Sequence, residues 1–315
     1  MKVVIMEDLG VSKQALDELK KPLEAKGCQF FDYQRTTDTA VLIEQAKDAD
    51  AMILANMPMP AEVINACDNL KFIDIAFTGV DHVAMDAARA KKIDVSNATG
   101  YSNEAVAELA IGLAVGLMRK IPQTETRCRN GETKAGLVGG EIKGRKIGII
   151  GLGNIGKRSA ELFHAFGAEI LACSRSVHND YPEYITQVTM DQLLEESDIV
   201  VLHCPLNDST RGMIGKAQLE KMKKSAYLIN LARGPVVVAK ELADALNQDV
   251  IAGAAIDVFD KEPPLDASEP LLNAKNTILT PHIAFASDES MQLRAQIIMD
   301  NLEAWMNGSP VNVVK

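Results

Sequence analysis

Short runs of consecutive apolar residues recur along the chain, separated by stretches with the period of a helix. In the first hundred residues these runs occupy positions 3–6, 30–31, 51–54, 72–76 and 93–95. Helical stretches, such as 12–26 and 83–91, lie between them. Because continuous rather than alternating hydrophobicity is typical of strands buried on both faces, we expect a parallel sheet built from strand–helix–strand units.

The second part of the chain repeats this rhythm after a long apolar helix. We expect that helix over 102–120, ending before Pro122, and a polar, glycine-rich surface connection over 123–145. Further strand-like runs follow at 147–150, 170–173, 199–202, 227–230, 254–258 and 277–280. Six strands alternating with helices are typical of a complete doubly wound dinucleotide-binding fold. A last helix is expected over 288–306.

Composition restricts the function classes. The 315 residues suffice for roughly two domains, and a 47% hydrophobic, 24% charged chain is ordinary for a globular protein. No apolar run approaches the ~20 residues of a membrane span, and the N-terminal run meets Glu7 too early for a signal peptide. The net charge of −10 argues against nucleic acid or an anionic membrane as partner. Five widely spaced cysteines without a metal-ligand pattern indicate reduced thiols in a cytoplasmic protein.

A glycine-rich turn, Gly151-Leu152-Gly153-Asn154-Ile155-Gly156, directly follows one predicted strand and opens a predicted helix. Gly151 permits the tight turn, Gly153 lets the backbone approach a pyrophosphate, and Gly156 lets the helix pack closely on the strand. The alternative is an ordinary glycine-rich turn. The strand before it and the helix after it favour dinucleotide binding, with the phosphates on the free N–H groups that begin with Asn154 and Ile155.

The end of the next strand differs from the usual pattern for NAD. An acidic residue is expected about 20 residues after the glycines, where it holds the ribose hydroxyl of NAD. The sequence has Ser174-Arg175-Ser176 instead. A hydroxyl beside a guanidinium accepts a 2′-phosphate, so we expect NADP to be favoured, with NAD possible. The alternative is an arginine that only faces solvent.

Polar side chains follow three later strands. Arg233, Glu262 and His282 each come after an apolar strand run, so they converge at the carboxyl edge of one sheet, where open α/β folds bind ligands. Together with the glycine turn and further motifs from Thr78 to His282, this order resembles the D-2-hydroxyacid dehydrogenases, which interconvert 2-keto acids and D-2-hydroxy acids with NAD(P). The resemblance covers nearly the whole chain.

The resemblance implies that Arg233, Glu262 and His282 are the catalytic residues. Arg233 binds the substrate carboxylate, His282 exchanges the proton of the substrate oxygen, and Glu262 orients His282. It also implies two doubly wound domains with the active site in the cleft between them. These are a flavodoxin-like substrate domain of residues 1–100 plus 287–315, and a Rossmann domain of residues 101–286.

Other positions follow from the same resemblance. Thr78 and Gly79 lie in the loop expected to hold the substrate carboxylate, and Asn56 and Met57 in a loop expected to face the cleft, although simple loop packing explains those two equally well. The remaining positions expected beside the cofactor are Cys204, Pro205, Ala232 and Asp257, the last as acceptor for the nicotinamide carboxamide.

Two other functions stay open. One is a phosphoglycerate dehydrogenase, whose phosphate-binding arginine is expected after the strand at 51–54, where this chain has Ala55-Asn56-Met57. The other is a dinucleotide-sensing corepressor, which the C-terminal-binding proteins exemplify on the same fold. We take the absence of a long tail after Val314 to favour the enzyme. A 2-keto acid with a small, uncharged side chain, such as glyoxylate or hydroxypyruvate, is therefore the expected substrate, and the apolar faces of the helix at 102–120 favour a homodimer.

Overall fold

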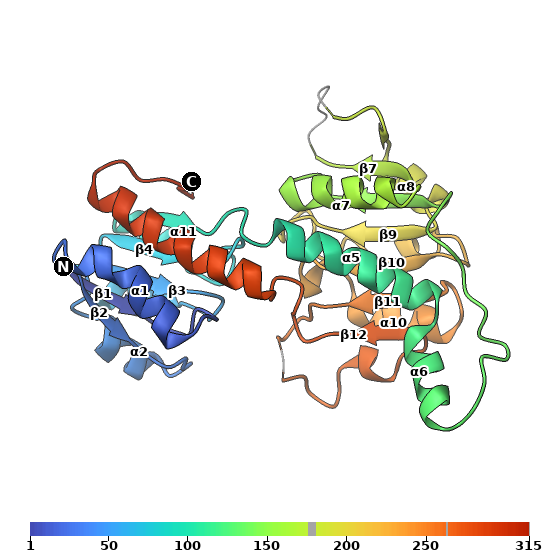
Figure 1. Ribbon diagram of the computed structural model, residues 1–315, viewed down its shortest axis with the longest axis horizontal. Helices are drawn as coiled ribbons and strands as arrows, with labels where there is room; N and C mark the ends of the chain where they lie inside the picture. The colour runs from blue at the N-terminus through green and yellow to red at the C-terminus, as the bar shows by residue number, and fades with distance from the viewer. Residues whose placement is uncertain (176–180, 263, 315) are drawn as a thin grey trace. The chain divides into compact units, whose positions relative to one another are not determined.

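A computed structural model describes residues 1–175, 181–262 and 264–314. The chain forms two compact units (Figure 1). The first unit comprises Met1–Ser102 and Ala286–Lys315, and the second comprises Asn103–Phe285. Each unit has its own parallel sheet covered by helices, which confirms the predicted α/β fold class.

The first unit contains, in the described residues, a five-stranded sheet with the order β2-β1-β3-β4-β5 and parallel pairing throughout. This is the flavodoxin-like order. Every strand falls on one of the predicted apolar runs. The strands are β1 (Lys2–Ile5), β2 (Gln29–Asp32), β3 (Ala51–Leu54), β4 (Phe72–Ile75) and β5 (Asp94–Asn97).

The helices of the first unit come from both ends of the chain. Figure 1 shows α1 (Lys13–Glu24) beside α11 (Asp288–Met306), and the two pack together. The bounds of α11 are those predicted, and it begins at a capping box in which Ser287 and Ser290 exchange hydrogen bonds. Helix α4 (Met85–Ala90) is also close to its prediction. Two further helices, α2 (Thr39–Ala46) and α3 (Ala61–Ala66), were not predicted.

The second unit contains, within the described residues, a seven-stranded parallel sheet with the order β12-β11-β10-β9-β6-β7-β8. The sequence predicted six of these strands. The seventh, β8, has three residues, too few for a hydrophobic pattern. The strands are β6 (Lys146–Ile150), β7 (Glu169–Cys173), β8 (Ile185–Gln187), β9 (Ile199–Leu202), β10 (Tyr227–Asn230), β11 (Gly253–Ile256) and β12 (Thr277–Leu279).

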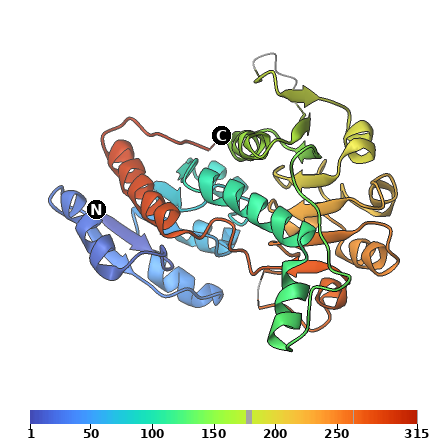
Figure 2. The ribbon, with the colours of Figure 1, turned by 45° about the vertical axis from the view of Figure 1, so that its right-hand side comes forward.

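The sheet of the second unit is buried on both faces, which explains its continuous apolar runs. On β9, Ile199 and Val201 pack against one core, while Val200 and Leu202 pack against another. Figure 2 shows a helix layer on either side of this sheet. One layer is α5 (Asn103–Met118) and α7 (Asn154–Ala165). The other is α8 (Met190–Glu196), α9 (Lys216–Leu219) and α10 (Ala239–Asn247).

The stretch after α5 corrects one prediction. Pro122 does end the pattern of α5, but it lies in the first turn of another helix, α6 (Ile121–Arg129). The prediction of an irregular connection over 123–145 is therefore wrong for its first seven residues. Proline is well tolerated in a first turn because the N–H it lacks would have no partner there. No helix among the described residues is both long and apolar enough to cross a membrane.

Candidate active site

The glycine turn forms as predicted between β6 and α7. Gly151 has φ +96°, and a Cβ added to it would lie 2.6 Å from the backbone nitrogen of Cys204. A Cβ on Gly156 would lie 2.1 Å from the carbonyl oxygen of Gly151. Both positions therefore require glycine, one for backbone conformation and close approach, the other for helix–strand packing.

Gly153 requires glycine for neither of these reasons. It is the N-cap of α7, its φ is −75°, and an added Cβ would meet nothing within 4 Å. No side chain caps the helix, so the N–H groups of its first turn, starting at Asn154 and Ile155, have no side-chain partner there. Open space in front of uncapped N–H groups at the positive end of a helix fits a pyrophosphate.

The turn lies at the switch point of the sheet, because β6 is flanked by β7 on one side and β9 on the other. Open α/β folds bind ligands in the crevice at such a point. The N–H of Gly151 donates to the carbonyl of Cys173 at 2.9 Å, so the residues after β7 share this edge. Ser174 there is partly buried and Arg175 is exposed. Ser176 lies outside the described residues.

The residues that follow β9 lie on the other side of the turn. Cys204 is buried, and burial raises the pKa of its thiol to about 11, which keeps the thiol protonated and inert. Pro205 beside it is exposed. His203 bonds through Nε2 to Ser159 of α7 at 2.9 Å, and burial lowers its pKa to about 4, so its ring is neutral.

A histidine–carboxylate pair joins the loops after β11 and β12. Nδ1 of His282 lies 2.9 Å from Oε2 of Glu262. Since an ionised carboxylate only accepts hydrogen bonds, Nδ1 is the donor. His282 has φ +58°, a conformation uncommon outside glycine. The backbone N–H of His282 donates to the carbonyl of Asp257 at 2.8 Å, which ties its loop to the end of β11.

The side chain of Asp257 also holds that loop through hydrogen bonds. The fully buried carboxylate accepts hydrogen bonds from Thr280 Oγ1 at 2.5 Å, Ile283 N at 2.8 Å and Ala284 N at 2.9 Å. Burial raises the pKa of Asp257, and these hydrogen bonds act in the opposite direction. Both carboxylate oxygens therefore hold the segment that carries His282.

Arg233 is placed by the loop after β10. The side chain of Asn230 accepts from Ala232 N and donates to the carbonyl of Arg233, both at 3.0 Å. A Cβ on Gly234 would lie 2.0 Å from the carbonyl carbon of Phe259, so glycine is required where this loop meets the loop leading to Glu262. The structure therefore brings the loops of Arg233, Glu262 and His282 together at one sheet edge, as predicted.

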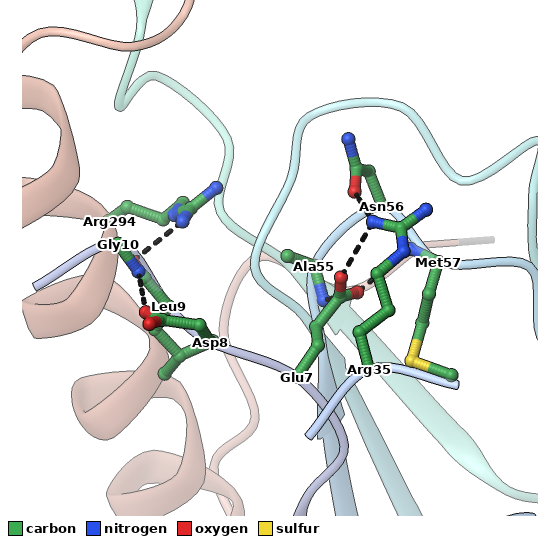
Figure 3. A network of polar contacts seen from close by, with 9 residues as sticks. All are labelled: Glu7, Asp8, Leu9, Gly10, Arg35, Ala55, Asn56, Met57 and Arg294. Carbon is green, nitrogen blue, oxygen red and sulfur yellow. Dashed lines mark hydrogen bonds and ion pairs between the residues drawn. The ribbon is translucent and has the colours of Figure 1, made fainter. Parts of the chain in front are cut away.

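The corresponding edge of the first unit is organised by a buried glutamate (Figure 3). Oε1 of Glu7, at the end of β1, accepts from the backbone nitrogens of Ala55 and Met57, each at 2.8 Å. Its Oε2 lies 3.0 Å from Nη1 of Arg35, and the same Nη1 donates to Oδ1 of Asn56 at 2.6 Å. Asn56 is partly exposed, whereas the side chain of Met57 is buried, so the prediction that Met57 faces a cleft is not supported.

Thr78 and Gly79 follow β4 at this same edge. Thr78 is exposed, and its carbonyl accepts from the side-chain amide of Asn97 at 2.7 Å. The sequence predicted Asn56, Thr78 and Gly79 here, but it missed Glu7 and Arg35. An acid directly after the first strand was the available signal for Glu7. Within the described part of the chain, no cluster of three or more His, Cys, Asp or Glu side chains could hold a metal ion.

An open glycine turn at a switch point, with an imidazole–carboxylate pair on the same sheet edge, is the arrangement of a dinucleotide-dependent oxidoreductase. Sequence comparison agrees. The family described as D-isomer specific 2-hydroxyacid dehydrogenase, NAD binding domain, matches residues 111–284. The hydroxypyruvate reductase of Blautia hydrogenotrophica is 35% identical over 328 aligned residues, covering 100% of this chain and 99% of that protein.

Two further relatives show the range of similar proteins. The D-3-phosphoglycerate dehydrogenase of Archaeoglobus fulgidus is 34% identical, covering 99% of this chain and 58% of that protein. The structure of an acyclic imino acid reductase with NADPH and D-Arg matches with a TM-score of 0.91 at 27% identity, covering all of both chains. The chain belongs to the D-isomer specific 2-hydroxyacid dehydrogenases, a family of oxidoreductases that use a nicotinamide dinucleotide.

Proposed function

We propose that this protein interconverts a small 2-keto acid and the D-2-hydroxy acid, with glyoxylate or hydroxypyruvate as the leading substrates. The observation that carries the proposal is the His282–Glu262 pair, held at 2.9 Å on the sheet edge that also bears the glycine turn. The relationship to a hydroxypyruvate reductase along the whole chain supports the same assignment.

Three side chains perform the reaction in this proposal. Arg233 binds the substrate carboxylate through its planar guanidinium. Glu262 accepts from Nδ1 of His282, which leaves Nε2 to give a proton to the keto oxygen. A nicotinamide dinucleotide, when bound, would supply a hydride to C2 of the keto acid. The proton from His282 completes the hydroxyl, and His282 then recovers a proton from solvent.

The units divide the work in the proposal. The second unit is the Rossmann domain. The turn from Gly151 to Gly156 holds the pyrophosphate on the N–H groups that begin α7. Cys204, Pro205 and Ala232 lie toward the nicotinamide end, whereas the fully buried carboxylate of Asp257, already bonded through both oxygens, supports the loop of His282 instead. The first unit is the substrate domain. Its residues Thr78 and Gly79 bind the substrate carboxylate, and Asn56 lies in the loop that follows the adjacent strand β3.

Turnover tests the proposal directly. The purified chain is assayed for NADPH and NADH oxidation with glyoxylate, hydroxypyruvate, pyruvate and a branched 2-keto acid, and for NAD(P) reduction with D-glycerate and 3-phosphoglycerate. We expect turnover with the small keto acids and faster oxidation of D-glycerate than of 3-phosphoglycerate. Dinucleotide binding without turnover of any of these compounds would contradict the proposal and favour a dinucleotide sensor.

We also propose that NADP(H) is preferred to NAD(H). Ser174 and Arg175 stand after β7 where an acid would repel a 2′-phosphate, and Arg175 is exposed and able to pair with it. The expected preference in kcat/KM is about tenfold, equivalent to ~1.4 kcal/mol. Ser174→Asp should reverse it, and Arg175→Ala should weaken NADPH binding far more than NADH binding. Equal effects of Arg175→Ala on both cofactors would refute this assignment.

A homodimer is the last part of the proposal. Leu109, Ile111 and Val115 of α5 are only partly buried, so part of the apolar surface of this long helix is left for a partner to cover. A two-fold pairing is the commonest closed arrangement. Light scattering at micromolar concentration should give twice the 34.1 kDa chain mass, and a monomeric mass would exclude the dimer.

A further inference from the structure

Residues 55–57 contain no arginine, but an arginine that follows another strand, Arg35, lies at the same sheet edge. Arg35 follows β2, and its side chain reaches past the end of β1 to Asn56 after β3 (Figure 3). One nitrogen, Nη1, contacts both Glu7 Oε2 at 3.0 Å and Asn56 Oδ1 at 2.6 Å. Arg35 is thus attached at one corner of its guanidinium, while its side chain stays 48% exposed.

Arg35 determines which way the amide of Asn56 faces. A guanidinium has only hydrogen-bond donors, so the amide of Asn56 can bond to it only through its oxygen. The amide nitrogen must then point the other way, as Figure 3 shows. Glu7 in turn fixes Arg35, and Glu7 is itself fixed by the backbone of Ala55 and Met57. These successive contacts turn the side-chain N–H donors of Asn56 outward and its side-chain oxygen inward.

The same contacts remove the net charge of this corner. The carboxylate of Glu7 is 5% exposed and pairs with Arg35, so the two charges compensate each other. Within the described residues, Nε and Nη2 of Arg35 have no hydrogen-bond partner. The corner therefore offers N–H donors from Arg35 and Asn56 without a net positive charge. Such a surface suits a neutral oxygen acceptor better than a phosphate.

We infer that Arg35 and Asn56 select 2-keto acids that carry a hydroxyl at C3, and that Glu7 is the positioning residue for Arg35. This inference rests on the proposed function. The loop of Thr78 and Gly79, proposed to hold the substrate carboxylate, follows β4, the immediate neighbour of β3. Neighbouring strands lie about 4.8 Å apart. A three-carbon acid spans a comparable length, so its C3 hydroxyl reaches Asn56 when its carboxylate is bound at Thr78.

The ratio of kcat/KM for hydroxypyruvate to that for pyruvate measures this selection, since the two acids differ only in the C3 hydroxyl. Arg35→Met keeps the length of the side chain and removes every donor. We expect the ratio to fall about tenfold, which corresponds to a hydrogen bond of ~1.4 kcal/mol. Asn56→Asp, which turns a carboxylate toward the substrate, should lower the ratio at least as far.

Controls separate recognition from folding. Lys47→Met also removes a cation from the first unit, but Lys47 pairs only with Glu44 in the described residues, and both ratio and activity should be unchanged. Glu7→Gln should lower the ratio mainly through KM, because it loosens Arg35 without removing it. A fall of equal size for both keto acids in Arg35→Met would overturn the inference, since it would show that Arg35 only supports the loop.

Binding distinguishes this inference from the proposed function. Calorimetric titration of D-glycerate and D-lactate into the NADPH complex, which has no hydride acceptor and cannot oxidise them, gives the same comparison without turnover. If no keto acid is reduced, yet Arg35→Met lowers the affinity for D-glycerate relative to D-lactate, the proposed function fails while the selection by Arg35 stands. If a phosphorylated three-carbon keto acid is preferred to hydroxypyruvate, and Arg35→Met abolishes that preference, the corner is an anion site and the inference is wrong.

Discussion

The first strands of the two parallel sheets end in opposite chemistry. Strand β6 of the second unit ends in the glycine turn, where backbone N–H groups face open space at a helix start. Strand β1 of the first unit is followed by Glu7, whose buried carboxylate already accepts from the neighbouring backbone N–H groups. One edge leaves its backbone N–H groups open to an anion, whereas the other satisfies them with a carboxylate of the chain itself. The same architecture therefore assigns dinucleotide binding to one unit through a few residues at a strand end.

Each edge nevertheless uses the same means of fixing its loops. Glu7 holds the loop after the adjacent strand β3, and Asp257 holds the loop after the adjacent strand β12. They differ in their partners. Both accept from two backbone N–H groups, but Glu7 also pairs with an arginine, whereas Asp257 also accepts from a threonine hydroxyl. The first edge thereby gains an exposed donor surface, and the second gains a rigid support for His282.

The largest expected effect separates chemistry from recognition. If the second edge carries the chemistry, His282→Ala should lower kcat by about 10²–10⁴-fold, because it removes proton transfer to the substrate oxygen. Dinucleotide affinity should change little. Steady-state kinetics and a fluorescence titration of NADPH measure the two quantities. His164→Ala is the matched control, since His164 is exposed on α7 and stacks on Tyr184. Near-normal turnover in His282→Ala would refute the assignment.

The glycine turn provides the second test. Gly153→Ala adds a methyl group into open space at φ −75°, so stability should stay within about 1 kcal/mol of wild type. Dinucleotide binding should weaken by about tenfold or more, because the methyl group stands where the pyrophosphate approaches.

Gly151→Ala is the structural counterpart, with a clash against Cys204 at φ +96° and an expected loss of about 1–3 kcal/mol in unfolding free energy. Urea denaturation and NADPH titration distinguish the two variants. A large loss of stability in Gly153→Ala would mean that this glycine, too, serves the fold.

The carboxylate of the first unit provides a third test. Glu7→Gln places an amide nitrogen either against Arg35 or against two backbone N–H groups, so donors face donors. We expect the free energy of unfolding to fall by about 1–3 kcal/mol, measured by urea denaturation. Glu18→Gln breaks an exposed pair with Lys21 and should change stability by less than about 1 kcal/mol. Equal effects of the two substitutions would show that Glu7 does not organise its edge.

A fourth test concerns the acid stability of the second unit. Burial lowers the pKa of His203 from 6.5 to about 4, so between these values the unfolded chain binds the proton and the folded chain does not. Above pH 6.5 the ionisation of His203 does not change the free energy of unfolding. As the pH falls from 6.5 toward 4, protonation of the unfolded chain lowers that free energy by up to about 1.4 kcal/mol per pH unit. The difference in unfolding free energy between wild type and His203→Gln should therefore shift across this range. A constant difference would mean that His203 is not held neutral.

Local patterns in the sequence predicted most of the architecture. Strands buried on both faces produce unmistakable apolar runs, and α11 combines helical periodicity with a capping box. The prediction failed where the local sequence fits more than one structure or is too short to show a pattern. A proline signals a helix end and a helix start equally well, so α6 was missed, and β8 has only three residues.

Part of the candidate site could be predicted from the sequence and part could not. The glycine turn and the Arg233, Glu262 and His282 loops follow strand ends that are visible in the sequence, so their convergence was predictable. The Glu7–Arg35–Asn56 contacts were not, because they join residues 28 and 21 positions apart through side-chain geometry alone. No pattern along the chain indicates that an arginine after one strand reaches a loop two strands away.

Helix α11 has a consequence for the order of events during synthesis. Its Trp305 stacks on Phe72 of β4 with ring centroids 4.9 Å apart, and its Asn301 bonds to the buried Asp74 at 2.9 Å. The sheet of the first unit is thus finished by residues translated more than 200 positions later. In the described residues, the strands of the second unit end at Leu279, so that sheet is translated before α11. The unit that the ribosome begins first is therefore the one that reaches its final packing last.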